Sequence, residues 1–217
     1  MITMRIHALS LGLLCLFLLE GAAAAGKVEN GVYVSPLNNF TVPIPDWRGL
    51  KIQDRSEDDF AIVSFLDRSD FPAPLQSVVT LRLPADAEQI FLDPSKRDAA
   101  LQSFLTGFVM PHLFQNVAPG STITHRELLD DGDRRFYFAV ANIPEGHTFL
   151  HNPNKGKQDD SVSGLLIFQH KGFMYMVRLE MRSLSNPGLD ATSLSLKDLE
   201  SARRSLLRIV NTMKFTN

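Results

Sequence analysis

The sequence predicts an α+β fold: a central antiparallel β-sheet of about eight strands, flanked by helices in an α/β/α sandwich. Three observations lead to this prediction. Most of the chain after residue 25 consists of short segments in which apolar and polar residues alternate, as they do in half-buried strands. Turn sequences, Asp-Gly at 131–132 and Lys-Gly at 171–172, join two pairs of these segments. Two further segments, 93–111 and 195–213, repeat apolar residues at helical spacing.

The expected strands are rich in β-branched and aromatic residues and are bounded by turn-forming residues. They are 31–36, 39–45, 60–66, 75–83, 121–129, 134–143, 161–170 and 173–182. Trp47 follows the second of them and is expected to pack into the core. Residues 48–59 are polar and charged without regular ligand spacing, so we expect a solvated loop there rather than a metal site. In the last strand Arg178, Glu180 and Arg182 share one face, and we expect its far half to reach solvent.

Both helices have recognisable boundaries. Asp93 and Pro94 suit the N-cap and the first turn of the first helix, and Pro111 is expected to end or kink it. Ser195 and Asp198 have the spacing of a capping box at the start of the second helix. Because the apolar residues of each helix form one stripe, we expect both helices to pack on the sheet.

The first 25 residues have the three parts of a secretory signal peptide. Arg5 and the amino terminus supply positive charge, residues 9–19 form an apolar stretch, and small residues at 21–25 end in Ala-x-Ala. A transmembrane anchor needs about 20 apolar residues, which this stretch does not reach. We therefore predict cleavage after Ala25 and export to a periplasmic or secreted location. The mature form is then expected to lack a transmembrane anchor.

The mature chain, 26–217, is predicted to be a single domain. Removal of the signal removes Cys15, the one cysteine, and with it any disulfide or thiol chemistry. Secreted eukaryotic domains of this size usually carry disulfides, so their absence favours a bacterial periplasm or release from a bacterium. The net charge of −2, without a basic stripe, excludes the electrostatic footprint of a nucleic-acid-binding protein.

Residues near the start and at the end of the mature chain together resemble a known family. Residues 32–36 read Val-Tyr-Val-Ser-Pro and residues 40–47 read Phe-Thr-Val-Pro-Ile-Pro-Asp-Trp, while residues 209–215 read Ile-Val-Asn-Thr-Met-Lys-Phe. This combination resembles the PsbP-like superfamily, named after an extrinsic photosystem subunit. The same fold occurs in a nuclear-import factor that binds the Ran GTPase and in bacterial exported proteins. Thr212 stands where the family usually has Ser. The resemblance implies a central antiparallel sheet with helices packed on it, and no photosynthetic role.

The sequence favours a binding function over an enzymatic one. It has no Gly-x-Ser-x-Gly elbow, phosphate loop, His-Glu-x-x-His motif or dinucleotide fingerprint. Scattered carboxylates could still carry out acid–base chemistry, which needs no sequence signature. We expect an exported, non-enzymatic domain without catalytic residues, which binds a protein or small ligand outside the cytoplasm. Its longest irregular segment, 144–160, is the expected contact surface, because long connections are often functional.

A divalent-metal or small-ligand site in the 144–160 segment is the alternative. His147, His151, Asp159 and Asp160 combine imidazole and carboxylate groups, which suit zinc or a similar divalent ion. A polar surface loop with incidental histidines is the simpler interpretation of the same residues, and no other cofactor is expected. The Asp-Asp-Gly-Asp sequence at 130–133 lacks the alternating ligands and distal Glu of a calcium loop. We therefore interpret it as a hairpin turn.

Overall fold

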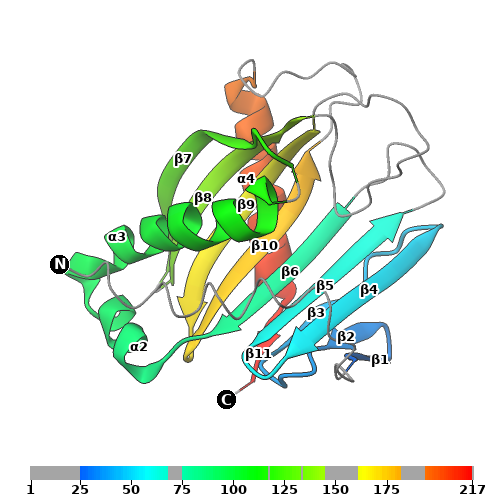
Figure 1. Ribbon diagram of the computed structural model, residues 1–217. Coiled ribbons are helices and arrows are strands. Elements are labelled where there is room, and N and C mark those ends of the chain that lie inside the picture. Colours follow the sequence, from blue (N-terminus) through cyan, green and yellow to red (C-terminus); the bar gives the residue numbers. More distant parts are fainter. Residues whose placement is uncertain are drawn as a thin grey trace.

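The computed structural model describes residues 25–67, 75–116, 118–132, 134–144, 161–181 and 194–216. These residues form two antiparallel sheets and several helices, which confirms the α+β class (Figure 1). The large sheet has the strand order β4-β5-β6-β10-β9-β8-β7, and the small sheet has the order β1-β2-β3-β11. The expected eight-stranded sheet is therefore divided between a large sheet and a small one.

The strands of the large sheet are β4 (Leu50–Glu57), β5 (Phe60–Asp67), β6 (Leu75–Arg82), β7 (Thr122–Asp131), β8 (Arg134–Ile143), β9 (Ser161–His170) and β10 (Phe173–Met181). Those of the small sheet are β1 (Lys27–Glu29), β2 (Val32–Val34), β3 (Phe40–Pro43) and β11 (Lys214–Phe215). The helical segments are α2 (Ala85–Leu92), α3 (Pro94–Phe104), the π-helix η2 (Leu105–Gln115) and α4 (Leu196–Thr212). The sequence did not predict β1, β11 or α2.

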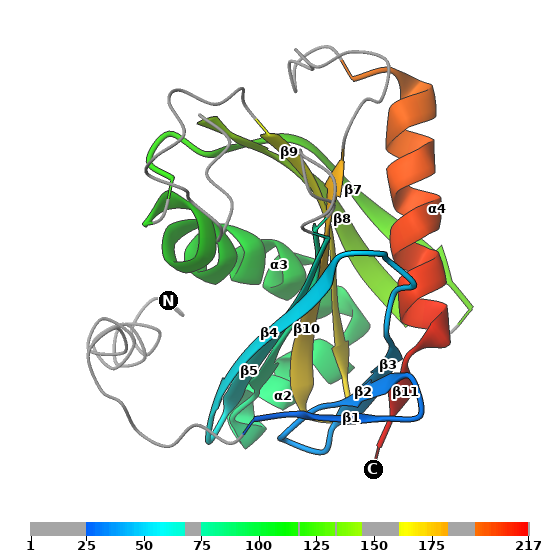
Figure 2. The same cartoon turned by 90° about the vertical axis from the view of Figure 1, so that its right-hand side faces the viewer.

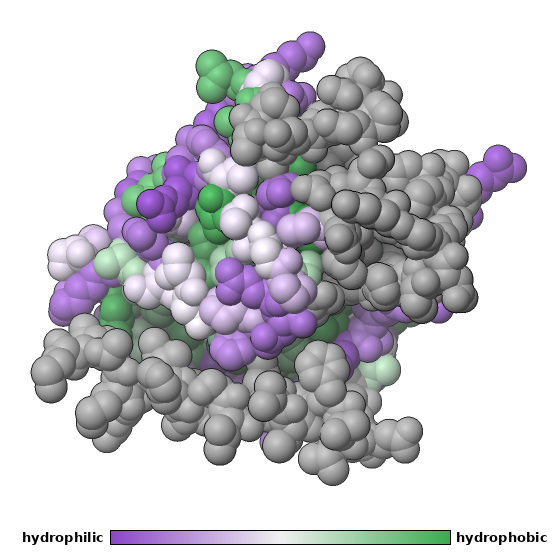
Figure 3. All heavy atoms as spheres, turned by 45° about the horizontal axis from the view of Figure 1, so that its top comes forward, coloured by the Kyte–Doolittle hydropathy of each residue, from purple (hydrophilic) through white to green (hydrophobic). Residues whose placement is uncertain are grey.

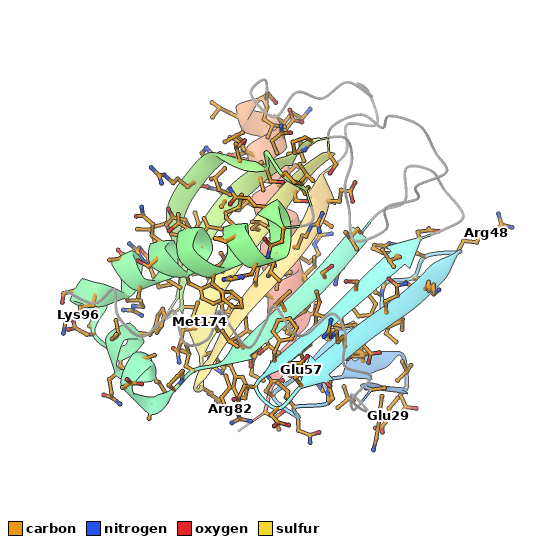
Figure 4. The ribbon with its side chains drawn as sticks, in the orientation of Figure 1. Glu29, Arg48, Glu57, Arg82, Lys96 and Met174 are labelled. Atoms are coloured by element: carbon orange, nitrogen blue, oxygen red, sulfur yellow. The ribbon has the colours of Figure 1, made fainter. Side chains whose placement is uncertain are left out.

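Both faces of the large sheet are covered. Seen edge-on, the sheet has α3 on one side and α4 on the other (Figure 2). The apolar side chains of β10 alternate between the two cores, since Tyr175 and Val177 pack toward α4 and Met174 and Met176 toward α3 and η2. In Figure 4 Met174 lies between the sheet and the helices of that side. Trp47 packs against the core on the α4 side, as expected.

The expected helix boundaries and turns are largely confirmed. Ser195 and Asp198 make both hydrogen bonds of a capping box, and the Asp93 side chain accepts a bond from the Ser95 N–H. Lys171 and Gly172 both have positive φ, at 46° and 74°, as a tight two-residue hairpin turn requires. Strands β7 and β8 likewise form a hairpin that closes at the 131–134 pair.

One expectation about backbone structure was wrong, and of the two outcomes expected at Pro111, an end or a kink of the helix, the structure excludes the end. Residues 50–57 form an edge strand rather than a loop, and they are polar because this strand has one neighbour and no helix over its outer face. Pro111 does not end the first helix, which continues as η2. The Asn116 N–H bonds to the Pro111 carbonyl at 3.2 Å, five residues back. This wider π-helical turn takes the backbone out of the α-helical register in which a proline ring collides with the preceding turn.

Candidate functional site

Three connections leave the large sheet from the same end. Strands β5, β8 and β10 finish there and β6 and β9 begin there, as shown by the pairs Leu66–Leu75, Ile143–Ser161 and Met181–Val162. We call this the loop end, and it lies at the upper right of Figure 1. The segment expected to be the contact surface leaves the sheet here. His147, His151, Asp159 and Asp160 belong to that segment and lie outside the described residues.

A buried arginine lies in the central strand near the loop end. Arg178 is on β10, the fourth of seven strands, and its exposed fraction is 1%. Its Nε–H donates to the Ser163 hydroxyl at 2.9 Å, and its Cζ lies 5.2 Å from the centre of the Phe114 ring on η2. Glu180, two residues further along the strand, is 8% exposed. The expectation that Arg178 and Glu180 reach solvent is therefore wrong, because η2 covers this face of the strand. Arg182 lies outside the described residues.

Serine hydroxyls extend this polar region across the sheet. Ser77 on β6 is paired with Arg178, and its hydroxyl lies 2.9 Å from that of Ser64 on β5. Both serines are buried. Two residues further from the loop end, the same face carries Met176, Val79 and other hydrocarbon side chains. These polar residues thus interrupt an otherwise apolar face, because Leu66, Leu75 and Ile143, which lie nearer the loop end, are buried hydrocarbon side chains again.

The electrostatics of this cluster favour retention of charge. Burial lowers the pKa of Arg178 to about 10, while the negative charge of Glu180 opposes that shift. The guanidinium consequently stays protonated at neutral pH. A planar cation with several N–H donors is well suited to carboxylates and other oxyanions, and the neighbouring hydroxyls can donate or accept. The cluster can therefore hold fixed charges inside the sheet near the loop end without transferring a proton.

A β-bulge creates a second feature near the loop end. The register of β7 and β8 shifts between Ile123 and His125, so Thr124 is the extra residue. An open cavity of about 440 Å³ is lined by these residues and Arg126. The His125 Nε2 atom lies 3.9 Å from the Glu127 carboxylate, which is 3.6 Å from Arg203 on α4. This cavity was not predicted from the sequence, in which a register shift between paired strands leaves no local signal.

The described histidines serve separate parts of the fold. His112 lies beside Phe108 on η2, with ring centroids 5.4 Å apart, and the His170 ring lies 4.7 Å from that of Phe215. Together with His125 they occupy three different elements. Within the described ranges there is no group of three or more His, Cys, Asp or Glu side chains placed to hold a metal.

The aspartates of the β7–β8 turn form ion pairs with arginines. Asp131 contacts Arg134 at 2.9 Å, and Asp130 contacts Arg135 at 2.5 Å. Arg135 also reaches Asp98 on α3 at 2.8 Å and thereby ties the hairpin to that helix. These contacts give the carboxylates a structural role in the hairpin, in agreement with the turn interpretation.

The described surface near the loop end is mostly polar. With the top of the molecule brought forward, hydrophilic and intermediate residues cover most of the coloured surface, and hydrophobic residues lie in small separate groups (Figure 3). Among the described helices none has the length and apolarity to cross a bilayer.

In comparisons with known proteins, the chain matches solved structures by fold but matches no family model and no curated protein by sequence. The matching solved structures include the cyanobacterial PsbP protein CyanoP from Synechocystis sp. PCC 6803, with 11% identity over 89% of this chain and 98% of that one and a TM-score of 0.48. The Saccharomyces cerevisiae Ran-binding protein Mog1p matches with 13% identity over 88% and 95% and a TM-score of 0.43. A Bacteroides thetaiotaomicron protein matches with 10% identity over 88% and 50% and a TM-score of 0.46.

These matches include both kinds of protein that the sequence resembles, the PsbP subunit and the Ran-binding factor. The likeness is distant, with identities of 10% to 13% in these three structures. Neither an activity nor a partner follows from it. We therefore derive function from this chain's own residues.

The buried charges should be strongly coupled. Arg178→Met leaves Glu180 buried without its neighbouring cation, so we expect a loss of about 3 kcal/mol in the free energy of unfolding. Arg178→Met combined with Glu180→Gln should lose less than the sum of the two single variants, by about 1 kcal/mol or more. Urea denaturation of the four proteins measures this coupling. Strictly additive losses would show that the two charges do not interact.

The stability of the protein should fall in mild acid because of His170. Burial, followed by the positive charges of Lys171 and Arg134, lowers the pKa of this imidazole. The unfolded chain therefore binds the proton more tightly than the folded chain. This contribution to stability is intact above about pH 6.5 and is lost as the pH falls toward the lower folded pKa. His170→Gln should flatten the fall in urea midpoint between about pH 7.5 and 5.5; a parallel fall in both proteins would contradict this.

Proposed function

We propose that this protein is an exported, non-enzymatic binding domain that holds a protein or small-ligand partner at the loop end of its large sheet. The observation that carries this proposal is the buried pair of charges, Arg178 and Glu180, which lies with Ser163 in the central strands at that end. Elsewhere on the same face the equivalent positions carry hydrocarbon side chains.

The chemistry of the cluster supports binding over catalysis. Arg178, whose pKa is about 10, stays charged at neutral pH, so it can supply a fixed positive charge beneath the loop end but is a poor proton donor or acceptor. Buried charges are also costly, since their desolvation offsets much of their mutual attraction. A site that must recognise a charged or polar group has a reason to retain them. We propose that this is why charged residues, rather than apolar ones, occupy these two positions of β10.

The export part of the proposal is supported by the signal-like amino terminus. Each described helix and strand begins after residue 25, so cleavage there would remove no element of the described fold. The partner is accordingly proposed to lie outside the cytoplasm, in the periplasm or in the surrounding medium.

Site-specific photo-crosslinking in the native host tests the location of the contact surface. A photoreactive residue at Thr124 or Arg126, both exposed on β7, should form a reproducible adduct with one partner. Controls at Glu29 and Lys96 are also exposed and lie away from the loop end (Figure 4). We expect the adduct from Thr124 to be several-fold stronger than from either control and to weaken with Arg126→Glu. Adducts formed at the controls alone, or turnover of a substrate without any adduct, would refute the proposal.

The metal site remains the second possibility, and it has a separate test. It predicts that zinc copurifies with the exported protein in a stoichiometric amount and that His147→Ala with His151→Ala removes it. Elemental analysis of the two purified proteins measures this directly. Equal metal content in both would exclude these histidines as ligands.

A further inference from the structure

The backbone nitrogen of Gly26 lies against a carboxylate on the edge strand. Its N–H donates to Asp54 Oδ2 on β4 at 2.5 Å. The Tyr33 hydroxyl on β2 donates to the same oxygen at 3.1 Å. Gly26 and Asp54 are both half-buried, while Tyr33 is 1% exposed. One carboxylate oxygen is thus shared by a phenol in the core and the nitrogen of a residue at the amino-terminal edge of the fold.

Packing at this point accepts only glycine. A Cβ built on Gly26 would overlap the hydroxyl, Cζ and Cε2 atoms of Tyr33. That ring has little room to move, since it packs edge-on against Phe65 with centroids 6.1 Å apart and also contacts Phe40 at 6.3 Å. Burial and the neighbouring Asp54 charge raise the pKa of the Tyr33 hydroxyl, so it stays protonated and donates. The site therefore selects residue 26 by shape and by hydrogen bonding.

The sequence singles out the same residue for an unrelated reason. The Ala-x-Ala pattern places signal cleavage after Ala25, so that position 26 is the first of the mature chain. Ala25 is exposed, whereas Gly26 already contacts the folded domain. The predicted scissile bond thus lies at the boundary between an accessible residue and the packed domain.

We propose that Gly26 is the mature amino terminus and that the α-ammonium group created by cleavage forms an ion pair with Asp54 beside the Tyr33 hydroxyl. Hydrolysis of the Ala25–Gly26 bond by a leader peptidase consumes one water molecule. It leaves a carboxylate on Ala25 in the released leader and an ammonium group on Gly26. The inference rests on the export part of the proposed function.

Cleavage then strengthens a contact that already exists. A neutral N–H donor becomes a cation, and charge-assisted hydrogen bonds are roughly twice as strong as neutral ones. The pair joins the start of β1, whose three residues are exposed, to edge strand β4 of the large sheet. Processing thereby strengthens the link between the small sheet and β4, which is the edge strand of the large sheet and pairs only with β5.

The first test is the identity of the mature terminus. The full chain is produced in a secretion-competent bacterium, and the exported protein is analysed by amino-terminal sequencing and intact mass. We expect one terminus, at Gly26. An exported protein with a different terminus would overturn this inference and leave the export proposal intact. Retention of the leader inside the cell would overturn both.

The second test asks whether Asp54 binds the α-ammonium group of the exported protein. Selective acetylation of the α-amine of the exported protein should lower Tm by about 2–4 °C, the shift expected for loss of roughly 1 kcal/mol in a chain of this size. In Asp54→Asn the same acetylation should leave Tm unchanged. Asp46→Asn, which alters an exposed carboxylate, should behave like the wild type. An equal effect of acetylation in all three proteins would show that Asp54 does not hold the terminus.

A glycine substitution tests the shape of the site without altering any charge. Gly26→Ala should still be processed, because alanine is also small, but its Tm should fall as the new Cβ displaces Tyr33. Gly107→Ala is the matched control, since a Cβ there meets nothing within 4 Å, and it should leave Tm unchanged or raise it. A Gly26→Ala protein as stable as the wild type would contradict the proposed fit.

Discussion

The rest of the structure depends on the burial of β10 from Phe173 to Arg178. This strand has three strands on each side in the large sheet and helices or the small sheet over each face. A strand in such a position normally reads as a continuous apolar run, and its first half does so with Phe173, Met174, Tyr175, Met176 and Val177. The second half departs from the rule by carrying Arg178 and Glu180 in the same environment. The fold therefore places two charges where water cannot solvate them, and serine hydroxyls from β5, β6 and β9 surround that region.

The two halves of the sheet accordingly have different roles. Away from the loop end, aromatic and aliphatic side chains from both cores supply most of the burial that stabilises the domain. Near the loop end, a polar cluster around Arg178 and Glu180 interrupts the helix-covered face, and a cavity lies beside the bulge in β7 at the sheet edge. Stability gained in one half allows the other half to retain costly polar groups. This division supports the proposed binding role. The contact between Gly26 and Asp54 is a second partly buried polar interaction, and it lies at the junction of the two sheets.

Local sequence signals predicted most of the fold. The Lys171–Gly172 turn requires positive φ at both residues, and the capping box of α4 depends on residues three apart, so short-range patterns were sufficient for both. The site was harder to predict, because burial of Arg178 is imposed by η2, which lies more than 60 residues earlier in the chain. Alternating charges on a strand look like a solvent-facing surface until the covering helix is known. The polar strand β4 was missed for the converse reason, since it pairs as an edge strand despite a loop-like composition.

NMR of arginine side chains tests the central claim most directly. If Arg178 is buried in the sheet with its Nε–H bonded to Ser163, that proton should exchange with solvent far more slowly than those of exposed arginines such as Arg48 and Arg204. Ser163→Ala should accelerate its exchange and leave the exposed arginines unchanged. Slow exchange that is sensitive to Ser163 is the result we predict. Exchange of the Arg178 proton as fast as that of the exposed arginines would contradict a charged cluster inside the sheet.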